Sequence, residues 1–144
     1  MSLSTTEERK ETIRRVHLAA WNEGDFKLLE STHADGFVMH DPMGERDLDG
    51  LKEMIEQVRA GSDDLELRVD DLIAEGDRVV MRYTLGGTNT GPSFLTDEPT
   101  GETWEGSGIS IYRLEDSAIA EQWDSFDYLG VMRQLGLVPS EHEE

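Results

Sequence analysis

The spacing of apolar residues changes from a helical to a strand period near Gly61, and this change constrains the fold more than any other feature. Before it, Ile13, Val16 and Trp21 recur at the spacing of one buried helix face. After it, apolar residues in Leu65–Val69 alternate with charged ones, as in a half-buried strand. Helices followed by a run of antiparallel strands predict an α+β fold.

The same patterns predict the order of elements along the chain. A capping box, Ser4–Glu7, begins the first helix, and a long loop, Gly86–Gly101, is expected to be functional, for example as a lid. We expect helices at 5–21, around Leu28-Leu29, after Asp49-Gly50 and around 129–135, and strands at 36–41, 65–71, 78–85, 103–114 and 118–126.

Length and charge limit the class of protein. The 144 residues suit one domain, expected at 1–138, with an acidic tail at 139–144 that we expect to be disordered. The formal net charge of -19 argues against nucleic acid and anionic membranes as partners, and the lysine-poor acidic surface resembles that of halophilic proteins. The chain has no cysteine, no long apolar run and no signal-peptide pattern, so we expect a cytoplasmic protein.

Two aspartates, Asp124 and Asp127, stand among Trp123, Phe126 and Tyr128 where a predicted strand runs into a helix. An aspartate among aromatic side chains is costly to ionise, so its pKa rises and it can serve as a general base or acid. The two have opposite parity on a strand and therefore point to opposite faces. Asp127 suits an N-cap, so Asp124 is the better candidate base and Asp127 a secondary one.

Other polar and aromatic residues allow a structural or a functional role. His40 and Asp41 could form a catalytic dyad, but no second histidine lies at ligand spacing, so we expect no metal. His17 lies on the apolar stripe of the first helix, as a core residue or facing a pocket. His33 is expected at a helix end. The aromatic residues that could line an apolar cavity, or simply form the core, are Trp21, Tyr83, Trp104, Tyr112 and Trp123.

Three stretches carry a family resemblance: Ala20–Asp25, Val38–Pro42 with Asp49-Gly50 following, and Gly106–Gly136. The last ends in Trp-Asp-x-x-Asp-x-Leu-Gly-x-x-x-Gln-Leu-Gly. In this order, and over nearly the whole length, the chain resembles the SnoaL-like polyketide cyclases of the nuclear-transport-factor-2-like superfamily. That resemblance implies a cone-shaped α+β barrel, in which a curved antiparallel sheet surrounds an apolar pocket and N-terminal helices close its wide end.

The resemblance also implies a chemistry. Cyclases of this family close a ring by an intramolecular aldol condensation without metal or cofactor, and a pocket aspartate removes a carbon-bound proton. The matching aspartate is Asp124, and the matching aromatic pocket residue is Trp21. The histidine that assists the aspartate falls at Ser110, which can donate a hydrogen bond but cannot supply a cation.

Two functions remain open at this point. The first is an enzyme of the aldol cyclase or isomerase type, acting on a small hydrophobic carbonyl compound with Asp124 as base. The second is a non-catalytic protein that binds a small apolar ligand in the same pocket. A second polar group within hydrogen-bond reach of Asp124, such as His40, His17 or Ser110, would favour the enzyme. Neither function needs a cofactor, and the family resemblance implies a homodimer paired through the sheet.

Overall fold

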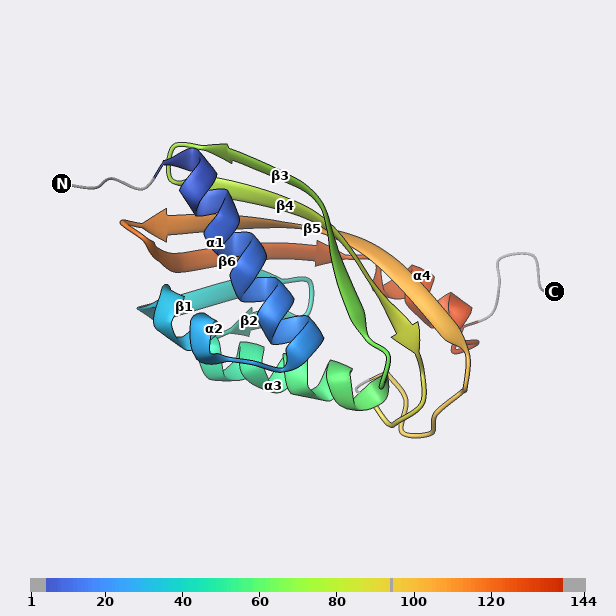
Figure 1. Cartoon of the computed structure of the whole chain (residues 1–144). Coiled ribbons are helices and arrows are strands. Elements are labelled where there is room, and N and C mark those ends of the chain that lie inside the picture. Colours follow the sequence, from blue (N-terminus) through green and yellow to red (C-terminus); the bar gives the residue numbers. More distant parts are fainter. Residues whose placement is uncertain (1–4, 94, 139–144) are drawn as a thin grey trace.

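A computed structural model describes residues 5–93 and 95–138 of the chain (Figure 1). No helix in this part of the chain is long and apolar enough to cross a membrane. The elements in chain order are α1 (Thr6–Leu18), the π-helical turn η1 (Ala19–Glu23), α2 (Lys27–Thr32), β1 (His33–Asp41), β2 (Gly44–Arg46), α3 (Leu48–Gly61), β3 (Glu66–Glu75), β4 (Arg78–Thr88), β5 (Thr103–Glu115), β6 (Ala118–Phe126) and α4 (Tyr128–Gln134).

The strands form one curved six-stranded sheet in the order β2-β1-β6-β5-β4-β3, which is not closed into a barrel (Figure 1). The α+β fold is therefore confirmed. The expectation of a purely antiparallel sheet is wrong in one place, because β1 pairs with β6 in parallel. The helix α3 separates β1 from the run β3 to β6 in the sequence, so β1 can enter the sheet in either direction.

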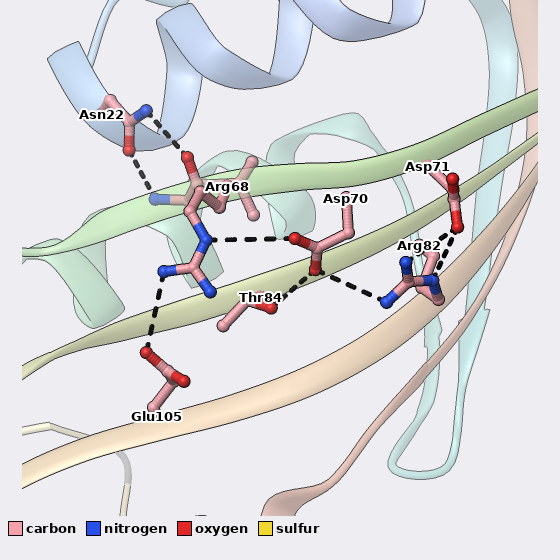
Figure 2. Close-up of polar contacts among 8 residues, drawn as sticks. Asn22, Arg68, Asp70, Asp71, Arg82, Thr84 and Glu105 are labelled. Carbon is pink, nitrogen blue, oxygen red and sulfur yellow. Dashed lines mark hydrogen bonds and ion pairs between the residues drawn. The ribbon is translucent and has the colours of Figure 1, made fainter.

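The first helix starts one residue later than the capping box predicts, and its predicted last turn is the π-helical η1. The Thr5 side chain caps it by accepting a hydrogen bond from the Glu8 amide at 3.0 Å, whereas Ser4 lies outside the described residues. Gly24 ends η1 with a φ of 68°, a left-handed conformation that glycine adopts readily. Just before it, the Asn22 amide exchanges two hydrogen bonds, at 2.7 and 3.1 Å, with the backbone of Leu67 (Figure 2). The end of the helix is therefore fastened to the edge strand β3.

Several predicted boundaries differ from the structure. His33 is the C-cap of α2, as expected, and is also the first residue of β1; β2 was not predicted because it has only three residues. The helix α3 begins at Leu48, so Asp49-Gly50 lies within it rather than before it, and Asp47 caps it by accepting a hydrogen bond from the Gly50 amide at 2.9 Å. β4 continues to Thr88, so the predicted long loop shortens to 89–102.

Alternation along the strands divides the sheet into an inner and an outer face. In β5 the buried residues Ser110 and Tyr112 alternate with the exposed Ile109 and Ile111. The inner face packs against α1 and α3. Buried side chains of the sheet and of these helices form one core cluster there, which includes Ile13. The predicted helix stripe and strand alternation thus bury the same core.

The outer face of β3, β4 and β5 carries a network of charged and polar side chains (Figure 2). Asp70 accepts a hydrogen bond from the Thr84 hydroxyl at 2.6 Å and lies 3.9 Å from both Arg68 and Arg82. Arg68 also reaches Glu105 at 3.7 Å. This face therefore holds its charges in pairs at the protein surface, where each pair contributes little to stability.

Candidate active site

A cavity opens between the inner face of the sheet and the helices. Its empty space, including the open solvent at its mouth, is about 880 Å³. Most of its walls are apolar or aromatic, for example Met39, Leu51, Met54, Trp104, Phe126 and Val131. Since the lining is drawn from α1, α3, α4 and five strands, the fold as a whole determines its shape.

Asp124 is the carboxylate in this lining, and two hydroxyl groups hold it. Ser110 lies directly opposite it across the β5–β6 pair and donates a hydrogen bond of 2.6 Å to its Oδ1. Tyr83, from β4, donates a second hydrogen bond of 2.9 Å to the same oxygen. Three adjacent strands therefore fix the position of this carboxylate.

Gly108 allows Tyr83 to reach the aspartate. The two residues are register partners in the β4–β5 pair. A Cβ atom at position 108 would collide with the Tyr83 ring and hydroxyl. The absence of a side chain there lets the ring lie against β5, with its hydroxyl directed at Asp124.

Burial dominates the electrostatics of the site. It raises the pKa of the Asp124 carboxyl above its ordinary 3.8, although the hydrogen bonds from Ser110 and Tyr83 act to lower that pKa. The carboxylate of Asp41 adds a smaller effect that also raises the pKa of Asp124. Burial, together with the negative charge of Asp124, raises the pKa of the Tyr83 hydroxyl as well. Tyr83 is therefore a stable hydrogen-bond donor at neutral pH.

The two carboxylate oxygens of Asp124 have different surroundings. Both hydrogen bonds that the described residues donate to this side chain end on Oδ1. Oδ2 is therefore the oxygen that remains to exchange a proton with a ligand. A carboxylate with a raised pKa, one oxygen held and one oxygen free is suited to general acid–base chemistry.

A second group of polar side chains lines the cavity beside Asp124. The His17 Nδ1 lies 2.8 Å from the Ile13 carbonyl oxygen, and the His17 ring lies 4.9 Å from the Tyr112 ring between centroids. Burial lowers the pKa of His17 to about 4, so this histidine is neutral at pH 7. Gln122 faces Tyr112 across the β5–β6 pair and approaches the Ser110 Oγ at 3.5 Å.

The structure separates His40 from the cavity and so corrects its predicted place beside the aspartate. Its Nε2 lies 2.7 Å from Glu121 and its Nδ1 3.0 Å from Glu45, and its ring stacks on Trp123. Glu121 and Trp123 have the parity of the outer face, opposite to Asp124. Of the three predicted helpers, only Ser110 is hydrogen-bonded to the aspartate.

The remaining predicted residues divide between the cavity and the structural framework. Trp21 and Trp104 line the cavity, whereas Trp123 does not. Asp127 is the N-cap of α4, accepting a hydrogen bond from the Gly130 amide at 2.9 Å, as the sequence suggested. The loop 89–102 contributes Ser93 and Leu95 to the lining; Phe94 and His142 lie outside the described residues.

Gln122 and Tyr128 are two of the polar lining residues that the sequence did not identify as site residues. Gln122 shares the parity of Asp124 on β6, which predicts the face it lies on but not a role in the site. Tyr128 begins α4, and no pattern in the sequence distinguishes it from a surface tyrosine. Within the described residues, no group of three acidic, histidine or cysteine side chains could hold a metal ion.

Known proteins resemble the chain in sequence and structure. The profile of the SnoaL-like polyketide cyclase family matches residues 11–135. TsrD from Streptomyces laurentii is 33% identical, with 90% of this chain and 98% of that chain covered and a TM-score of 0.77. AclR from Streptomyces galilaeus, described as a candidate hydroxylase, is 26% identical, with 94% and 89% covered and a TM-score of 0.83.

A third solved structure, IdmH from Streptomyces antibioticus, is described as a candidate polyketide cyclase. It is 27% identical, with 90% of this chain and 99% of that chain covered and a TM-score of 0.78. Among curated proteins, none is similar enough to count as a match. Because the family profile spans nearly the whole chain, including the strands that hold Ser110 and Asp124, the protein belongs to the SnoaL-like polyketide cyclase family.

Proposed function

We propose that the protein is a cofactor-free acid–base enzyme that uses Asp124 to move a carbon-bound proton of a small hydrophobic carbonyl compound. The observation that carries this proposal is the buried carboxylate held on one oxygen by Ser110 and Tyr83. The largely apolar and aromatic lining of the cavity suits a compound with apolar rings. The family supports aldol cyclisation or isomerisation as the reaction type.

The proposed step uses the two oxygens of Asp124 differently. Oδ2 takes a proton from a carbon next to a carbonyl group, and the electron pair of the broken C–H bond moves to the carbonyl oxygen as an enolate. In cyclisation the enolate carbon then attacks a second carbonyl carbon of the same molecule, and the alkoxide formed there takes the proton from Asp124. In isomerisation the proton returns instead to a different carbon. Ser110 and Tyr83 keep Oδ1 in place both when Asp124 takes the proton and when it gives the proton back.

Deuterium exchange into 2-tetralone tests the proposal, because the C1 protons of this neutral bicyclic ketone are activated by both the carbonyl and the ring. We expect the wild-type protein to accelerate exchange in deuterated buffer, measured by proton NMR. The Asp124→Asn variant should lose roughly a hundredfold or more of that acceleration. Asp127→Asn is the matched control, since asparagine also caps helices well and residue 127 does not line the cavity.

A non-catalytic binding protein is the second candidate function. It is favoured by Ser110 itself, because a neutral hydroxyl supplies no positive charge to an enolate. The same experiment separates the two functions. Binding of 2-tetralone without any acceleration of exchange would support the binding protein and exclude the enzyme for this class of ketone.

We also propose that two copies pair through the outer face of the sheet. Ile73, Ile109 and Ile111 are 63%, 49% and 38% exposed there, and Ile111 lies in register between Val80 and Trp123. Exposed apolar side chains gathered on one face are typical of an interface. Sedimentation equilibrium should give a dimer for the wild-type protein and a monomer for Ile111→Arg; a wild-type monomer would contradict this assembly.

A further inference from the structure

Three buried polar atoms in the cavity lining have no hydrogen-bond partner among the described residues. They are the His17 Nε2, the Tyr112 hydroxyl and the Gln122 Oε1. The three residues are between 0% and 4% exposed. An unsatisfied buried polar atom costs roughly 1–3 kcal/mol. Three such atoms beside one cavity therefore indicate a binding site for a polar group of the ligand.

The three side chains lie close together. Tyr112 and Gln122 are register partners on β5 and β6. The His17 ring, from α1, lies 4.9 Å from the Tyr112 ring between centroids, at an angle of 45°. Ser110 precedes Tyr112 by two residues on the same face and connects this polar cluster to Asp124 through its 2.6 Å hydrogen bond.

Each atom has a defined hydrogen-bonding character. The His17 Nδ1 must carry the proton, because its partner, the Ile13 carbonyl, can only accept. With a pKa of about 4 the ring is neutral, so Nε2 is an acceptor. The Gln122 Oε1 is also an acceptor, since its Nε2 faces the Ser110 oxygen at 3.5 Å. The Tyr112 hydroxyl can donate and accept, although the nearby Ser110 side chain, which acts to lower the pKa of Tyr112, competes with a ligand for it.

This combination selects one kind of ligand group. A carboxylate or phosphate would meet two acceptors and no cation. A ketone oxygen could use only Tyr112 and would leave His17 and Gln122 unsatisfied. A hydroxyl group can donate to the His17 Nε2 while it accepts from Tyr112, with the Gln122 Oε1 as a further acceptor beside it, so it fits the cluster.

We propose that the polar cluster of His17, Tyr112 and Gln122 binds a hydroxyl group of the ligand, so that the substrates are neutral hydroxylated ring compounds. The bound hydroxyl fixes one end of the ligand and leaves the other rings in the apolar part of the cavity. This inference depends on the proposed function in one respect, that a reacting carbon of the ligand lies at Asp124. Binding at the cluster needs no turnover.

Two probes of nearly equal shape, 2-naphthol and 2-methylnaphthalene, test this proposal. The wild-type protein should bind 2-naphthol roughly fivefold more tightly, the effect of one net hydrogen bond. The nitrogen-15 NMR resonance of His17 Nε2 should shift with 2-naphthol and stay in place with 2-methylnaphthalene, because only the former donates to the nitrogen lone pair.

Variants assign the preference to residues. In His17→Phe, which keeps a ring at the site, the preference for 2-naphthol should fall toward one, with the affinity for 2-methylnaphthalene unchanged. In Asp124→Asn the preference should persist. An unmoved His17 resonance, a preference that His17→Phe retains, or no binding of either probe would overturn the proposal. Loss of ketone exchange with an intact naphthol preference would refute only Asp124 as base.

Discussion

Two acidic residues on β6, Glu121 and Asp124, lie three positions apart and on opposite faces of the sheet. On the outer face, the hydrogen bond with His40 is the main cause that lowers the pKa of Glu121, and Arg113 contributes further. On the inner face, burial raises the pKa of Asp124 in spite of two hydrogen bonds. The same carboxyl chemistry thus gives a stable surface charge on one side and a candidate base on the other.

The histidines follow the same division. His40 lies on the outer face between two carboxylates, at 2.7 and 3.0 Å. His17 is buried on the inner face, where no described residue bonds its Nε2. The two histidines therefore differ by the face on which they lie: both ring nitrogens of His40 have protein partners, whereas the Nε2 of His17 remains open to a ligand.

The largest expected effect on stability is acid destabilisation by the buried histidines. His17 and His33 have pKa values of about 4 in the folded chain, below the ordinary 6.5. Between pH 6.5 and 4 the unfolded chain binds protons that the folded chain does not. Stability is therefore lost as the pH falls through this window, by about 3 kcal/mol for each histidine.

Urea unfolding across that pH range measures this effect. The raised pKa of Asp124 acts in the opposite sense, because the folded state holds that proton more tightly, and it offsets part of the loss. His33→Phe should flatten the pH dependence relative to the wild-type protein. Equal slopes in the variant and the wild-type protein would contradict this account.

The next effect compares two isoleucines. Ile119 is fully buried in the core, and Ile109 is 49% exposed on the outer face. Ile119→Ala should cost about 3 kcal/mol of unfolding free energy because it leaves a cavity. Ile109→Ala should cost less than about 1 kcal/mol when measured at low protein concentration. Similar losses at both positions would show that the outer face is covered in solution.

The smallest effect sharpens the comparison of the two acids, with carboxyl-carbon NMR as the measurement. Tyr83→Phe removes a hydrogen bond from Asp124, so the pKa of Asp124 should move further above its ordinary value. His40→Leu removes the main partner of Glu121, so the pKa of Glu121 should rise back toward its ordinary value. A fall in the pKa of Asp124 would show that Tyr83 does not stabilise its charged form.

Local patterns predicted much of the fold and the identity of the central aspartate. Asp127 lies directly before α4, and this position predicted that it caps the helix. Because alternate residues of β6 point to opposite faces, Asp124 was then the aspartate expected to face the cavity. Both deductions depend only on residues within one or two turns of chain. The bounds of β6 were likewise predicted from the turn before it and the helix after it.

The rest depended on contacts between distant segments. His40 appeared suited to the site because it adjoins Asp41, but the parallel pairing of β1 with β6 places it next to Glu121 on the outer face. The contribution of Tyr83 required the order of three strands and the missing side chain of Gly108. Sequence spacing alone carries neither the sheet order nor the direction of β1.

The pKa of Asp124 in the folded protein tests the central claim most directly. Carboxyl-carbon NMR across a pH titration gives this value, with Asp124→Asn confirming the assignment of the resonance. The desolvated inner face predicts a pKa above the ordinary 3.8. A pKa at or below that value would mean a solvated or fully stabilised carboxylate, and it would contradict the role of Asp124 as a base.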